Sequence, residues 1–173
     1  MQSGMIFGIY WCISFLFLVS HDENLSAISS ILILSTPFVG FILAGKFKKD
    51  VQKDGQVSFG RGYFFSLLMY FYATAILSLT SLFYFKYFDH GTFIQQNLDM
   101  LNRPEVKQAL ESADIQKRLS GINMEEIKTS ISALTPTSIT ASILNFNVLF
   151  AFILSLPTAF FAMTRRMKEQ HTT

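Results

Sequence analysis

The sequence predicts an all-α protein, a four-helix transmembrane bundle with a short amphipathic helical segment on the extracytoplasmic side between the third and fourth helices. Only 15% of its 173 residues are charged, against about 25% in an average soluble domain. Each of four stretches that contain no Asp, Glu, Lys or Arg reaches the roughly 20 residues that an α-helix needs to cross a bilayer. These stretches are Met1–Ser20, Asn24–Gly45, Gly62–Phe85 and Thr129–Thr164.

This segregation of charge excludes two broad classes and makes the lipid bilayer the first expected partner. A soluble globular domain spreads charges over its surface, and a disordered chain lacks the apolar residues that make up half of this sequence. The net charge is only +2, and no segment gathers the basic face that a nucleic-acid binder needs. We therefore expect no nucleic acid among the partners.

The first predicted membrane helix covers Gly4–Ser20 and the second covers Leu25–Gly45, with a short polar turn between them. No Lys or Arg precedes the first helix, and no small-residue cleavage motif precedes His21. We therefore interpret it as a retained helix rather than a cleaved signal peptide. Its abrupt beginning also suggests that the natural start of the chain lies further upstream. The single cysteine, Cys12, is expected to be an inert packing residue.

The third predicted membrane helix covers Phe59–Phe85 and is rich in Phe and Tyr, and the fourth covers Ile139–Thr164. The uncharged stretch that contains the fourth helix is much longer than a bilayer requires. We expect Pro136 to interrupt this stretch before the fourth helix begins, because proline breaks helices.

Two short amphipathic helices are expected within residues 86–138. The first begins at Pro104, a favoured first helical residue, and ends at Gly121. The second begins at Asn123, where Glu126 completes a capping box. Helical spacing gives each an apolar stripe. The stripes are Val106, Leu110 and Ala113 in the first helix, and Ile127, Ile131 and Leu134 in the second.

The distribution of Lys and Arg predicts the orientation of the bundle. The loop Lys46–Arg61 contains five basic residues, whereas the turn His21–Asn24 contains none. Because basic loops stay in the cytoplasm, we expect this loop and both termini to be cytoplasmic. The same basic side chains are candidates for contacts with anionic lipid headgroups. They are Lys46, Lys48, Lys49, Lys53, Arg165 and Arg166.

Two prolines lie near the middle of predicted membrane helices. Pro37 and Pro157 lack the N–H that would bond the carbonyl four residues earlier, at Ile33 or Ile153. We predict that both helices kink there and that the first and third helices stay straighter. Each freed carbonyl should face the protein interior or accept a Ser or Thr hydroxyl. Both prolines end the pattern I-L-S-x-P, which reflects either a duplicated hairpin or chance.

The chemistry that these helices can support is limited. No Asp, Glu, Lys, Arg or His lies within the four uncharged stretches, which argues against an intramembrane enzyme and a proton-coupled transporter. We predict no catalytic residue and no cofactor. Imidazoles and carboxylates at the outer helix ends are weak candidates for metal ligands, although polar residues are expected wherever helices leave lipid. These candidates are His21, Asp22, Glu23, Asp89 and His90.

Small and polar residues within the helices indicate where helices pack closely. One of the two amides Asn145 and Asn147 is expected to hydrogen-bond another helix. Small residues at helical spacing let backbones approach, and the sequence leaves open whether they pack within the chain or between chains. These stripes are Gly4, Gly8 and Cys12 in the first helix, and Ala151, Ser155 and Ala159 in the fourth.

The stretch Val57-Ser58-Phe59-Gly60-Arg61-Gly62-Tyr63 follows a Lys-rich turn with Asp54-Gly55 and leads into an aromatic helix. With the four-helix plan and the long charged segment between the third and fourth helices, it resembles the domain of unknown function 4199 family of bacterial membrane proteins, common in Bacteroidota. The resemblance covers nearly the whole chain. It implies a location in the bacterial inner membrane and carries over no activity and no catalytic residue.

Two functions remain open at this point. The first is a non-enzymatic interaction or accessory membrane protein, whose partner would be another copy of the chain or another membrane or periplasmic protein. The alternative is a small homo-oligomeric transporter or channel, since four helices rarely enclose a pathway alone. A water-filled cavity near Pro37 and Pro157 would favour transport, and a solid core would favour interaction.

Overall fold

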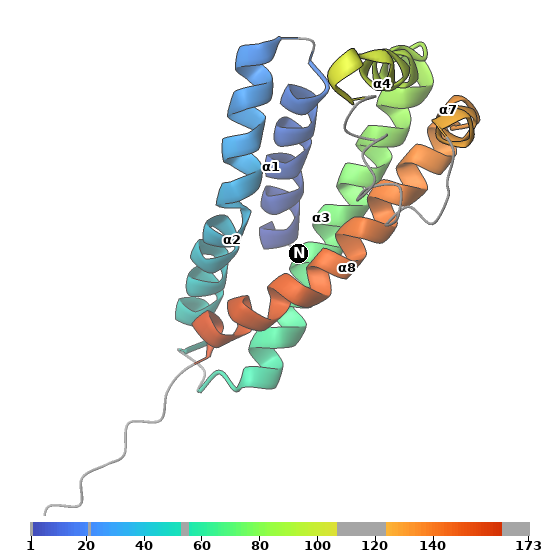
Figure 1. Ribbon diagram of the computed structural model, residues 1–173. Helices are drawn as coiled ribbons and strands as arrows, with labels where there is room; N and C mark the ends of the chain where they lie inside the picture. The colour runs from blue at the N-terminus through green and yellow to red at the C-terminus, as the bar shows by residue number, and fades with distance from the viewer. Residues whose placement is uncertain (1, 21, 53–55, 107–123, 164–173) are drawn as a thin grey trace, which may run out of the picture. The chain divides into compact units, whose positions relative to one another are not determined.

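The computed structural model describes residues 2–20, 22–52, 56–106 and 124–163. Throughout these ranges the chain forms α-helices joined by short connections, which confirms the predicted all-α class for the described residues (Figure 1). The helices are α1 (Gln2–Leu18), α2 (Glu23–Gln52), α3 (Phe59–Tyr87), α4 (Thr92–Asn102), α7 (Met124–Ser132) and α8 (Pro136–Ala162).

Three of these helices, α2, α3 and α8, are long and apolar enough to cross a membrane. Helix α1 is a shorter apolar helix of 17 residues. Large apolar side chains cover the outer helix faces, and Leu34, Ile42 and Leu79 are each at least 70% exposed. Such an apolar surface is expected where lipid rather than water surrounds the protein.

The chain divides into two compact units. The first contains α1, α2, residues 59–80 of α3 and residues 143–162 of α8, and the second covers residues 81–142. Within the first unit, α1 and α2 pack against each other as an antiparallel hairpin (Figure 1). Asp22 tightens the turn between them, because its carboxylate accepts the Asn24 N–H at 2.8 Å.

Helix α2 extends further than predicted. It continues past Gly45 to Gln52, so that Lys46, Lys48 and Lys49 lie on the helix rather than in a loop. Lysine is a good helix former, and a helix does not have to stop where its apolar segment ends.

The uncharged stretch is interrupted at residues 133–135, directly before Pro136, and α8 begins at Pro136 itself rather than at the predicted Ile139. Proline is favoured there, since its missing N–H would have no partner within the helix. Thr135 and Ser138 complete the cap reciprocally. The Ser138 N–H donates to Thr135 Oγ1 at 3.2 Å, and the Thr135 N–H donates to Ser138 Oγ at 2.8 Å.

The second unit contains a helix that was not predicted, α4. Its N-terminus is capped by Asp89, whose carboxylate accepts the N–H groups of Gly91 and Phe93 at 3.1 Å. Gly91 adopts a positive φ of 83°, which glycine tolerates without strain. Helix α4 ends at Asn102, and the backbone of the next residue, Arg103, is extended because Pro104 follows. Residues 104–106 are helical, as predicted for a helix that begins at Pro104.

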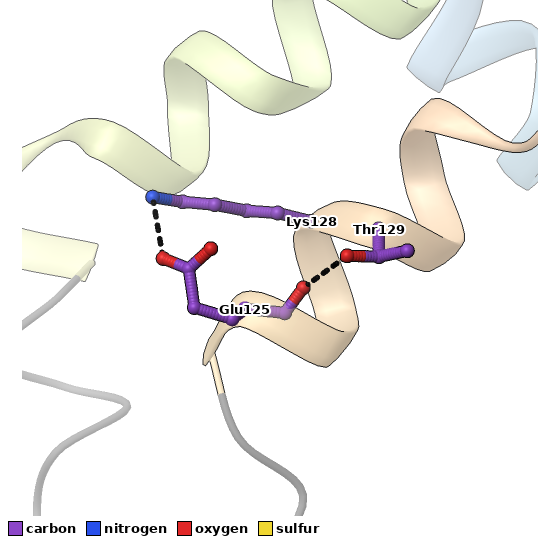
Figure 2. A network of polar contacts seen from close by, with 3 residues as sticks. All are labelled: Glu125, Lys128 and Thr129. Atoms are coloured by element: carbon purple, nitrogen blue, oxygen red, sulfur yellow. Dashed lines mark hydrogen bonds and ion pairs between the residues drawn. The ribbon is translucent and has the colours of Figure 1, made fainter.

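Helix α7 forms where the second short amphipathic helix was predicted. It packs against α4, and Ile127 and Ile131 of its predicted stripe are half-buried. On its surface, Lys128 Nζ lies 3.7 Å from the Glu125 carboxylate, and the Thr129 hydroxyl donates to the Glu125 carbonyl at 2.7 Å (Figure 2). Leu110, Ala113, Gly121 and Asn123 lie outside the described residues.

Candidate functional site

The aromatic ring of Tyr70 on α3 is completely buried in the first unit. Phe7 of α1 packs edge-on against it, with 5.0 Å between the ring centroids. Trp11 lies one turn further along α1, 5.1 Å from Phe7 and 6.3 Å from Tyr70. The four-residue spacing places Phe7 and Trp11 on one face of α1, so the three rings form one cluster between α1 and α3.

The Tyr70 hydroxyl brings two more helices to the same point. It shares a hydrogen bond with Thr158 Oγ1 of α8 at 3.0 Å. Helix α2 approaches through Gly40, where an added Cβ would overlap the Tyr70 hydroxyl oxygen. Sequence reasoning did not identify this site. The available signals were a glycine one turn after Pro37 and a threonine directly after Pro157.

Pro37 and Pro157 both lie inside helices that continue through them, α2 and α8. The prolines leave the carbonyls of Ile33 and Ile153 without their usual helical partner. Side-chain hydroxyls donate hydrogen bonds to the neighbouring carbonyls. The Tyr10 and Ser35 hydroxyls donate to the Leu32 carbonyl, next to Ile33, and the Thr158 hydroxyl donates to the Leu154 carbonyl, next to Ile153. Hydroxyls therefore cluster at both prolines, and the kinks themselves stay a prediction.

Small residues pack within the chain on both predicted stripes. On α1, an added Cβ would lie 2.9 Å from Tyr72 Cβ at Gly4 and 2.7 Å from Ile76 Cδ1 at Gly8. Cys12 continues the contact with α3, since its Sγ lies 3.2 Å from Thr80 Oγ1. On α8, Ala159 is fully buried and its backbone approaches Gly62 of α3.

Several small hydroxyl side chains are buried in the first unit. Ser66 and Ser155 donate to the carbonyl four residues earlier in their own helices, at 2.8 and 2.5 Å. Ser29 of α2 and Thr74 of α3 are also fully buried, and their hydroxyls have no hydrogen-bond partner among the described residues. The interior of this unit is therefore more polar than its outer surface.

The weak metal-ligand candidates have other roles where the structure describes them. The carboxylates of Asp22 and Asp89 accept backbone N–H groups at the two turns described above. His90 adopts a positive φ of 47° within the turn before α4. Across the described parts of the chain, no three His, Cys, Asp or Glu side chains gather as a metal site would require. His21 and the side chain of Glu23 lie outside the described residues.

The two asparagines of α8 differ in their surroundings. Asn147 is half-buried, and its amide donates to the Ile143 carbonyl of its own helix at 2.8 Å. Asn145 is exposed. The hydrogen bond described for Asn147 therefore stays within α8 rather than joining a second helix.

The basic cluster serves partly to hold α2 against α8. Lys48 Nζ donates to the Met163 carbonyl at 2.9 Å, just beyond the last residue of α8. A lysine there satisfies a carbonyl at the negative end of the helix dipole. Lys46 and Lys49 are exposed on α2. Lys53, Arg165 and Arg166 lie outside the described residues.

Near this cluster, α2 and α3 border an open hollow of about 620 Å³. Apolar side chains form most of its wall, and Phe47 stacks on Phe65 there with 3.8 Å between ring centroids. The lining residues are Phe47, Val51, Gly60, Arg61, Phe64, Phe65 and Leu68.

Comparison with known proteins identifies a family and no individual relative. The family described as "Protein of unknown function (DUF4199)" matches residues 2–164. No curated protein and no solved structure matches the chain. Because the match covers nearly the whole sequence, as the resemblance at residues 57–63 predicted, the chain belongs to the DUF4199 family.

Proposed function

We propose that this protein is a non-enzymatic interaction or accessory protein of the bacterial inner membrane, with α1 as a fourth membrane-crossing helix and both termini in the cytoplasm. The observation that carries the proposal is the packing around Tyr70. Side chains of α1, α3 and α8 and the backbone of α2 at Gly40 meet around the Tyr70 side chain. A transport pathway through one chain would need open space at this level.

The second unit offers the surface for a partner. Helices α4 and α7 pack against each other, and Met100 leaves more than half of its apolar surface exposed on α4. An exposed apolar side chain among polar neighbours is suited to contact with a second membrane protein or a periplasmic protein. The partner could be a second membrane protein, a periplasmic protein or another copy of the chain, and all three are to be tested.

One observation favours the alternative, a small homo-oligomeric transporter or channel. The buried hydroxyls of Ser29 and Thr74 have no hydrogen-bond partner among the described residues. Polar groups at membrane depth are usually satisfied by protein or by water in a cavity. A pathway built by several chains could supply that water.

Quantitative copurification tests the interaction proposal. The tagged protein is cross-linked in its native membrane, purified and analysed by mass spectrometry, with an unrelated multi-pass membrane protein of equal abundance as the control. We expect one protein in a constant ratio to the bait, and we expect Met100→Arg to reduce that ratio. Gln95→Arg adds the same charge to an exposed polar position of α4 and should leave the ratio unchanged.

Flux measurements on the purified protein in liposomes test the alternative. We expect proton and potassium flux no greater than in empty liposomes. The interaction proposal would be contradicted by two results together: a flux that falls in Thr74→Val, and no protein that copurifies in a constant ratio. Those results would favour the transporter or channel.

A further inference from the structure

The hollow between α2 and α3 combines two kinds of surface. Of its seven lining residues, only Arg61 carries a charge, and five have large apolar side chains. Arg61 is exposed, so its guanidinium is accessible. A ligand that matches both surfaces must carry a negative group and an apolar part.

The charged and apolar parts of the hollow are separated along the helix axis. Arg61 is the third residue of α3, and Leu68 lies seven residues further along the same helix. At about 1.5 Å per residue, the wall extends roughly 10 Å from the charge. Phe64 and Phe65 lie between these two ends, so the apolar surface continues from the guanidinium towards the middle of the helix.

In the proposed membrane arrangement, this hollow comes at the level of lipid headgroups. It borders the last turns of α2 and the first turns of α3, where the uncharged segments of both helices end and charged residues begin. The exposed Lys46 and Lys49 belong to the same end of α2. Basic pockets between membrane helices at this level attract anionic lipid headgroups.

We propose that this hollow is a binding site for one anionic phospholipid. The phosphate pairs with the Arg61 guanidinium, whose planar N–H groups match phosphate oxygens in a bidentate arrangement. One acyl chain lies along Phe64, Phe65 and Leu68, with the stacked Phe47 ring on the α2 side. Charge complementarity selects an anionic over a zwitterionic lipid.

Two glycines provide a matched pair of variants for blocking this site. An added Cβ at Gly60 or at Gly45 would meet no atom within 4 Å. Gly60 lines the hollow and Gly45 does not. Leucine favours helices more than glycine does, so Gly60→Leu and Gly45→Leu should both fold, and only the first places a side chain in the hollow.

Native mass spectrometry of the full-length protein, titrated with phosphatidylglycerol in detergent, measures the binding. We expect one lipid per chain, weaker binding of phosphatidylcholine, and an affinity about fivefold lower in Arg61→Gln, as expected for one basic residue near a membrane surface. Gly60→Leu should lower the affinity at least as much. Gly45→Leu should bind like the unmodified protein, and Lys49→Gln should lose less affinity than Arg61→Gln because Lys49 does not line the hollow.

A phosphatidylglycerol with a photoreactive acyl chain locates the bound lipid independently. We expect labelling at Phe64 or Leu68 and none at the exposed Leu34 of α2, with the labelling lost in Gly60→Leu. Glycerol phosphate, which lacks acyl chains, should not compete.

Several results would overturn the proposal. Equal affinities of Gly60→Leu and Gly45→Leu would show that the hollow is not occupied. Equal losses in Arg61→Gln and Lys49→Gln, or equal binding of phosphatidylcholine, would show only diffuse attraction to the basic cluster. A dimer that dissociates in Gly60→Leu would assign the hollow to a second copy of the chain.

Discussion

Tyr70 of α3 contacts or closely approaches the other three helices of the first unit. Its ring contacts α1, its hydroxyl bonds Thr158 of α8, and Gly40 of α2 leaves room for its oxygen. Buried tyrosines usually pair their hydroxyl with a polar partner. Here Gly40 is needed as much as the hydrogen-bond partner Thr158, because any side chain at position 40 would overlap the Tyr70 hydroxyl oxygen.

We predict that Gly40→Ala destabilises the protein, because the new methyl group overlaps the Tyr70 hydroxyl. Overpacking of this kind typically costs about 1–3 kcal/mol. Unfolding in dodecyl sulfate, followed through the fluorescence of Trp11, measures the change.

Gly45→Ala is the matched control, since an added Cβ there meets no atom within 4 Å, and it should be neutral or stabilising. Combining Gly40→Ala with Tyr70→Phe should recover part of the loss, because the nearest remaining ring atom would lie 3.3 Å from the new Cβ. Equal stabilities of Gly40→Ala and Gly45→Ala would contradict the prediction.

The helices of the first unit approach one another through small residues, and these residues differ from helix to helix. Helix α1 uses glycines to approach α3, and α8 uses alanines to approach Gly62 of α3. Helices of this kind gain stability from van der Waals contact and occasional hydrogen bonds rather than from hydrophobic burial. Many large apolar side chains consequently face outward, and small residues lie where two helix backbones approach most closely.

We predict that α2 and α8 bend at Pro37 and Pro157, because each proline removes one backbone hydrogen bond and its ring crowds the carbonyl four residues earlier. Helix kinks sharper than about 20° occur mostly at prolines and a few other local features. Helix-axis angles in an experimental structure of the protein and of Pro37→Ala provide the measurement. Bends below about 10° at both prolines would falsify this argument.

For the whole molecule, the open question is its orientation in the membrane. We predict that the end of α2, the start of α3 and the C-terminus are cytoplasmic, because Lys and Arg concentrate there. A fluorescent protein that folds only in the cytoplasm should be bright after Thr173. Alkaline phosphatase should be active after Gln95 of α4. The reverse pattern would invert the topology.

Much of the fold could be predicted because its signals lie along the chain. Uncharged stretches located α1, α2, α3 and α8 to within a few residues at most ends, and the family followed from the motif at residues 57–63. The helix ends and the helix that the sequence did not predict have local causes. Charged helix formers prolonged α2, Pro136 started α8 instead of preceding it, and α4 depended on a cap from Asp89 that lies three residues before the helix.

By itself, the sequence determined that the chain is helical, rich in apolar helices and a member of one family, because charge segregation and helical spacing are properties of neighbouring residues. Only the tertiary structure decided that Tyr70, Gly40 and Thr158 meet, that the stripe at Gly4 and Gly8 packs within the chain, and that Arg61 borders a hollow. Lipid does not distinguish one apolar helix face from another. Which helices pack together therefore depends on the complementary shapes of segments that are distant in the sequence. Patterns among neighbouring residues do not reveal this complementarity.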